Sequence, residues 1–97
     1  MVKPTDWIGH KFDELTYLCE LQEYVASTYD MHYAKGKHQA SELIIDAGYG
    51  EGFLMGNILK YWKRYGKKEG KNRQDLLKIL HYALIMLYAH DNITKGE

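Results

Sequence analysis

Cysteine and proline are nearly absent from this sequence, and long hydrophobic runs are missing. The single cysteine, Cys19, excludes an internal disulfide framework and cannot by itself build a structural zinc site. The formal net charge is +0, which argues against a general nucleic-acid coat or a polybasic membrane binder. No apolar run reaches the ~18 residues of a membrane span, and no signal peptide opens the chain. We therefore expect a cytoplasmic protein that binds neither DNA nor RNA nor a membrane.

The composition favours one small helical domain over residues 1–97. Hydrophobic residues make up 45% of the chain, which suffices for a core. Apolar residues recur every three or four positions in several segments, and no segment alternates as a strand would. The helical segments are expected at about 6–30, 39–47, 52–66 and 73–90, with caps at Asp6 and Asn72. The fold class is predicted to be all-α, a compact bundle of about four helices.

The fourth of these segments has almost no polar face. Its apolar side chains include Leu76, Leu77, Ile79 and Ile85, on different sides of the helix. A helix that is apolar nearly all round is buried on several sides. A chain this short offers few other elements to cover it, so we expect a homo-oligomer that associates through this helix.

Positive charge is concentrated although the whole chain is neutral. Residues 60–73 hold seven Lys and Arg against one Glu. Just before and within this stretch, Asn57, Lys60, Tyr61 and Arg64 follow at i, i+3, i+4 and i+7, which places them on one helix face. Arg suits a bidentate contact with phosphate, and Lys acts as a mobile point charge. The pattern indicates either a site for a small phosphorylated ligand or a solvated basic face.

Two further patterns are less specific. Gly48, Gly50 and Gly52 precede the basic helix, but they lack the form of a P-loop and follow a helix rather than a strand. In the fourth helix, Asp75 and Tyr82 share a polar stripe with Lys78. Asp75 is interpreted as part of a cap with an exposed ion pair, as the partner of a Lys or Arg from the third helix, or as a proton acceptor.

Acidic pairs raise the question of a metal. Glu20 with Glu23, and Glu42 with Asp46, each share a helix face and offer oxygen ligands for Mg²⁺. This resembles the all-α nucleoside triphosphate pyrophosphohydrolases, whose motif is ExxE followed by ExxD. Here the second pair is spaced ExxxD, so we predict exposed acidic faces and no metal site.

The stretch FLMGNILKYWKRYGKK, with His32 and Tyr33 before it and Asp75 and Tyr82 after it, resembles a small phage protein family that includes the T7-type phage nucleotide kinase. The resemblance covers about residues 31–88 and leaves residues 1–30 as an extra N-terminal helix. It implies a phage-encoded protein of the host cytoplasm that binds nucleotides without a P-loop, uses ATP as phosphoryl donor, and is compatible with Mg²⁺. The implied catalytic residues are Lys60, Arg64 and Asp75. The implied nucleotide-binding residues are His32, Tyr33, Asn57, Tyr61, Lys67, Lys68 and Tyr82.

Three functions are compatible with these patterns. The first is a small kinase that phosphorylates (deoxy)nucleoside monophosphates, since phosphoryl transfer needs chiefly positioning and charge stabilisation. The second is a non-catalytic sponge that sequesters a nucleotide immune signal. The third is an inhibitor that binds a host protein through apolar and tyrosine-rich surface.

Overall fold

The chain forms helices and no strands over the described residues. The computed structural model describes residues 11–30 and 37–95. Its elements are α1 (Glu14–Thr28), α2 (Lys37–Ile44), the π-helical turn η3 (Ile45–Tyr49), α3 (Gly50–Arg64) and α4 (Arg73–Lys95). The predicted all-α fold is confirmed. The compact bundle within one chain and the homo-oligomer remain predictions.

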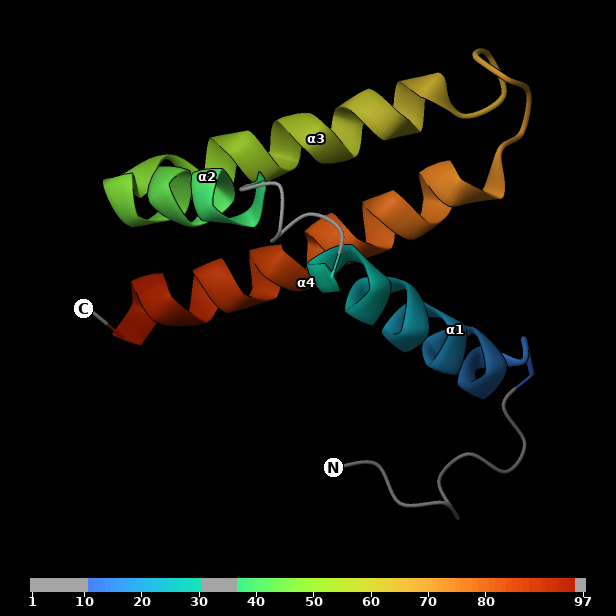
Figure 1. The fold of residues 1–97 in the computed structure, drawn as a ribbon, viewed down its shortest axis with the longest axis horizontal. Coiled ribbons are helices and arrows are strands. Elements are labelled where there is room, and N and C mark those ends of the chain that lie inside the picture. Colours follow the sequence, from blue (N-terminus) through green and yellow to red (C-terminus); the bar gives the residue numbers. More distant parts are fainter. Residues whose placement is uncertain (1–10, 31–36, 96–97) are drawn as a thin grey trace.

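The antiparallel pair α3 and α4 forms the centre of the molecule (Figure 1). Leu54 of α3 is fully buried, and Tyr61 of α3 and Ala89 of α4 are also buried. These side chains recur at helical spacing on the facing sides of the two helices, which is why the helices pair. This contact holds most of the tertiary packing, and α1 crosses α4 from one side (Figure 1).

The turn between α3 and α4 depends on glycine. Gly66 and Gly70 have φ of 84° and 69°, in the left-handed region that side chains disfavour. The Gly66 amide donates to the Gly70 carbonyl at 2.8 Å, closing the turn. The Asn72 Oδ1 then accepts from the Gln74 amide at 3.0 Å, which confirms Asn72 as the cap of α4.

The helix ends differ from the predictions at three places. The first helix begins at Glu14 rather than near Asp6, because Asp13 has a left-handed φ of 60° that interrupts the helix; Asp6 lies outside the described residues. The second helix begins at Lys37 rather than near residue 39, and its last part is the π-helical η3, where Gly48 has a φ of 92°. The fourth helix extends to Lys95 rather than ending near His90. Within the described part of the chain, no helix is both long enough and apolar enough to cross a membrane.

Candidate functional site

Two lysines converge on one tyrosine ring where α3 and α4 meet. The Lys60 Nζ lies 5.1 Å and the Lys78 Nζ 4.8 Å from the centroid of the Tyr61 ring. The Tyr82 ring stacks beside it, with the ring centroids 6.1 Å apart and the planes at 14°. We call Lys60, Tyr61, Lys78 and Tyr82 the tyrosine–lysine cluster. Its buried tyrosine fixes the position of two ammonium groups that come from different helices.

An arginine and a buried carboxylate adjoin the cluster one turn along each helix. The Arg64 Nε lies 3.6 Å from the Asp75 Oδ1, and the Arg64 Nη2 lies 3.8 Å from the Glu69 Oε2. The Asp75 side chain is only 3% exposed, whereas that of Glu69 is 63% exposed. The Arg64 Nε and the Asp75 Oδ2 are buried and make no hydrogen bond. Asp75 therefore holds the guanidinium at the helix pair, which is one of the three roles considered for it.

Asn57 lies on the same side of α3 as Lys60 and Arg64, as the spacing predicts. Its Nδ2 donates to the Phe53 carbonyl of the preceding turn at 2.9 Å. This bond satisfies part of the amide within its own helix, and the side chain is half-buried. The structure thus brings Asn57, Lys60, Tyr61 and Arg64 to one face and adds Lys78 and Tyr82 from α4.

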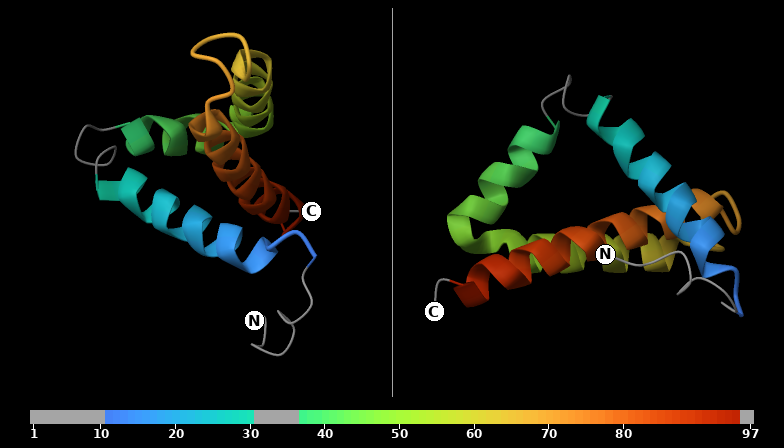
Figure 2. Two further views of the ribbon diagram at one scale, coloured as in Figure 1. Left: turned by 90° about the vertical axis from the view of Figure 1, so that its right-hand side faces the viewer. Right: turned by 90° about the horizontal axis from the view of Figure 1, so that it is seen from below.

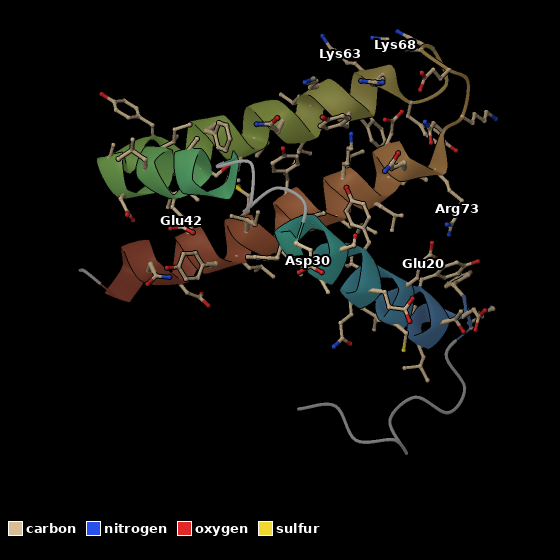
Figure 3. The ribbon with its side chains drawn as sticks, viewed as in Figure 1. Glu20, Asp30, Glu42, Lys63, Lys68 and Arg73 are labelled. Atoms are coloured by element: carbon tan, nitrogen blue, oxygen red, sulfur yellow. The ribbon has the colours of Figure 1, made fainter. Side chains whose placement is uncertain are left out.

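The other predicted phosphate ligands lie elsewhere. Lys67 and Lys68 belong to the turn after α3, where their backbone amides donate to the Arg64 carbonyl at 3.0 and 3.1 Å. Both side chains are exposed, and Lys68 projects away from α4, as does Lys63 (Figure 3). The predicted ligands His32 and Tyr33 lie outside the described residues.

An aromatic row extends the cluster toward α1. The His81 and Tyr82 rings are 6.3 Å apart, and the Tyr24 ring of α1 meets His81 edge-on at 6.0 Å. Burial raises the pKa of the Tyr82 hydroxyl, and the neighbouring Tyr61 raises it further. Burial likewise raises the pKa of Tyr24, with smaller contributions from Tyr82 and Tyr61. Both phenols thus remain neutral over the physiological pH range.

Sequence reasoning did not assign Lys78, His81 or Tyr24 to the site. Lys78 and Tyr82 are spaced i, i+4 on one helix face, so the polar stripe already noted with Asp75 was the available signal. Tyr24 and His81 are 57 positions apart and meet only because α1 crosses α4. No pattern within either helix could have paired them.

A cavity of about 510 Å³ lies beyond His81, between α4, the end of α1 and the segment from α2 into η3. Glu42 and Asp46 line it, and Glu42 points from α2 toward α4 (Figure 3). Its other lining residues are neutral or aromatic: Val25, Tyr29, Ser41, Ile45, His81, Leu84, Ile85 and Tyr88. The described residues of its wall include two carboxylates and no Lys or Arg, and this part of the wall disfavours a phosphate group.

The two acidic pairs weighed as magnesium ligands are separated in the structure. Glu20 accepts hydrogen bonds from both terminal nitrogens of Arg73, one of them at 2.7 Å, whereas Glu42 and Asp46 line the cavity. The contact with Arg73 lowers the pKa of the Glu20 carboxyl. Figure 3 shows Arg73 at the start of α4 reaching toward Glu20 on α1. Within residues 11–30 and 37–95, no group of three or more His, Cys, Asp or Glu side chains is arranged to hold a metal ion.

Comparison with known proteins identifies a family. Residues 27–84 match the family model DUF3310, described as a protein of unknown function. The match spans more than half of the chain, from the end of α1 into α4, so the chain belongs to this family. No curated protein and no solved structure matches the chain.

Proposed function

We propose that this DUF3310 protein binds a nucleotide at the tyrosine–lysine cluster, with its phosphates held by Lys60, Lys78 and Arg64. The observation that carries the proposal is the convergence of two ammonium groups on the Tyr61 ring, beside a guanidinium. The Tyr61 ring is buried, so each cation–π contact contributes between about 0.5 and 2 kcal/mol. A phosphate that contacts both lysines would replace these contacts with charge-assisted hydrogen bonds, which are about twice as strong as neutral ones.

Within this proposal, the protein transfers a phosphoryl group from ATP to a (deoxy)nucleoside monophosphate. Lys60 and Arg64 would neutralise the charge of the transferring group, while the buried Asp75 fixes the guanidinium. ATP is then the donor substrate, and Mg²⁺ would accompany it. The support is the resemblance of the stretch FLMGNILKYWKRYGKK to the phage family that includes a nucleotide kinase; such a protein would act in the host cytoplasm.

A second candidate is a sponge that holds a nucleotide immune signal without converting it, an anti-defence function. The position of Asp75 favours this non-catalytic function. Its side chain is buried and paired with Arg64, so it does not face a reacting hydroxyl group as a proton acceptor would. Binding by Lys60, Lys78 and Arg64 needs no such acceptor.

Mass spectrometry on one preparation separates these candidates. One sample is heat-denatured to release any co-purified nucleotide, and another is incubated with ATP, Mg²⁺ and a panel of nucleoside and deoxynucleoside monophosphates. New diphosphates that disappear in Arg64→Ala would establish the kinase, and a bound nucleotide recovered unchanged would establish the sponge. An inhibitor of a host protein would show neither nucleotide nor turnover.

Matched lysine variants locate the site. Lys60→Ala and Lys78→Ala should each weaken nucleotide binding about tenfold, since each removes one charge-assisted phosphate contact. Lys63→Ala removes the same charge from the same helix but from a side chain that projects away from α4 (Figure 3). Equal losses in all three variants would show a diffuse basic surface and would contradict the proposed site.

A further inference from the structure

One side of the α3–α4 pair is bare in the described chain. Figure 2 shows α1 and α2 together on one side of these two helices, with no element on the other. Large apolar side chains of α3 and α4 stay exposed away from the contact between the two helices. They include Met55, Leu59, Trp62, Leu76, Leu80 and Leu87, with exposed fractions of 38–68%. We call these six residues the hairpin face.

Helical geometry places part of the hairpin face on one side of the helix pair. Met55, Trp62 and Leu76 each follow a buried residue of the α3–α4 contact, so they lie about a quarter turn from it. Because α3 and α4 run antiparallel, a quarter turn in the chain direction rotates all three to the same side. Leu59, Leu80 and Leu87 lie nearer a half turn from the contact and form the outer edges of the face.

Lys60 of the tyrosine–lysine cluster lies on the opposite side, that of α1 and α2. Lys60 precedes the buried Tyr61, and His81 precedes Tyr82, so both are rotated a quarter turn the other way. His81 meets Tyr24 of α1 there, in agreement with the placement of α1 in Figure 2. A molecule docked on the hairpin face would therefore not cover Lys60 of the proposed nucleotide site.

We propose that the hairpin face binds the hairpin face of a second copy of this chain, forming a two-fold symmetric pair. All six side chains are uncharged and apolar, so two identical faces meet without like-charge repulsion, as a two-fold interface requires. The surface next to the cluster, with Lys60, Lys78 and Arg64, would repel its own copy.

The exposed area reaches the lower limit for a specific interface. If a large apolar side chain presents about 150–200 Å², the exposed parts of the six sum to roughly 500–600 Å² per chain, and two fully covered faces reach about 1,000–1,200 Å². The described chain also buries few apolar side chains, chiefly Leu21, Leu54, Tyr61 and Ala89. Pairing would supply the burial that a domain of this size otherwise lacks.

Sedimentation of the full chain across a dilution series tests the proposal. We expect a dimer that dissociates on dilution. Leu80→Glu should raise the dissociation constant at least 100-fold, while Leu43→Glu, at an exposed leucine of α2, should leave it unchanged. A monomeric wild-type chain, or equal effects of the two variants, would overturn the proposal. Capture of a host protein or lipid vesicles by a wild-type monomer would assign the face to that other partner.

Trp62 gives a readout that needs no disruptive change. Trp7 and Trp62 are the two tryptophans, so Trp7→Phe leaves Trp62 as the reporter. Its side chain is 68% exposed in the single chain. Emission should be blue-shifted and poorly quenched by acrylamide in the dimer, and should become readily quenched on dilution. Easy quenching while the chain sediments as a dimer would place the interface elsewhere and reject the hairpin face.

Discussion

The guanidinium of Arg64 at the end of α3 is held by the carboxylate of Asp75 in the first turn of α4, with Nε and Oδ1 3.6 Å apart. The pair joins the two central helices beside the turn that connects them. It also connects the fold to the proposed function, because the same guanidinium is one of the groups proposed to bind phosphate. The ion pair contributes to helix packing and, in the proposed function, would also hold a charge for the ligand.

Asp75→Asn should destabilise the protein by about 1–3 kcal/mol, because it leaves a partly buried guanidinium without its countercharge. Glu69→Gln removes the other carboxylate near Arg64, but that side chain is 63% exposed, and the free energy of unfolding should change by less than about 0.5 kcal/mol. Urea unfolding of both variants makes the comparison. Similar losses of unfolding free energy in the two variants would mean that the burial of Asp75 does not make its contact with Arg64 stronger than that of Glu69.

Leu54→Ala should lower the free energy of unfolding by about 2–5 kcal/mol. Leu54 is the fully buried large side chain between α3 and α4, and its truncation leaves a cavity. Leu43 is 71% exposed on α2, so Leu43→Ala should change stability by less than about 0.5 kcal/mol. Thermal or urea unfolding tests the pair of variants, and a small effect at Leu54 would contradict the central position of the α3–α4 contact.

Glu20→Gln should loosen α1 while leaving α3 and α4 intact. The Arg73–Glu20 pair is one of the few contacts between α1 and α4, and its contribution is present above the ordinary pKa of Glu and lost as pH falls through the lowered pKa of Glu20. Hydrogen exchange at neutral pH should show faster exchange in α1 alone. Glu23→Gln, on the same helix and exposed, is the control. Equal exchange in both variants would exclude a role for the pair.

Alkaline pH should destabilise the protein through Tyr82. Its pKa is raised in the folded state, so above the ordinary tyrosine pKa of about 10 the unfolded chain releases a proton that the folded chain retains. Stability therefore falls as pH rises beyond that value. Tyr82→Phe should reduce this decline, whereas Tyr49→Phe, at a side chain that is 73% exposed, should not. Urea unfolding at several alkaline pH values measures the difference.

Helical periodicity predicted the all-α fold and the face shared by Asn57, Lys60, Tyr61 and Arg64. These are local properties, because i, i+3 and i+4 spacing within one helix fixes which side chains adjoin. The cap at Asn72 was predictable for the same reason. The start of α1 was not, because the left-handed backbone of Asp13 leaves no trace in the apolar pattern.

Contacts between helices could not be predicted from the sequence. The pairing of Asp75 with Arg64 was one of three interpretations, and only the antiparallel return of α4 selects it. The contact of Tyr24 with His81 depends on the crossing of α1 over α4. The fourth helix was expected to be buried on several sides, yet Leu76, Leu80 and Leu87 remain exposed in the single chain. Periodicity identifies apolar sides of a helix, but it does not tell which molecule covers each of them.

In the turn from Gly66 to Gly70, the sequence needed to form the turn differs from the sequence at its exposed tip. The hydrogen bond that closes the turn and the two left-handed glycines fix the path of the chain, and the exposed side chains of Lys67 and Lys68 contribute no contact to it. The side chains at positions 67 and 68 can accordingly be exchanged without changing how α3 meets α4. Since folding places no demand on those two lysines, retention of their charge among homologues would measure selection on what the protein binds.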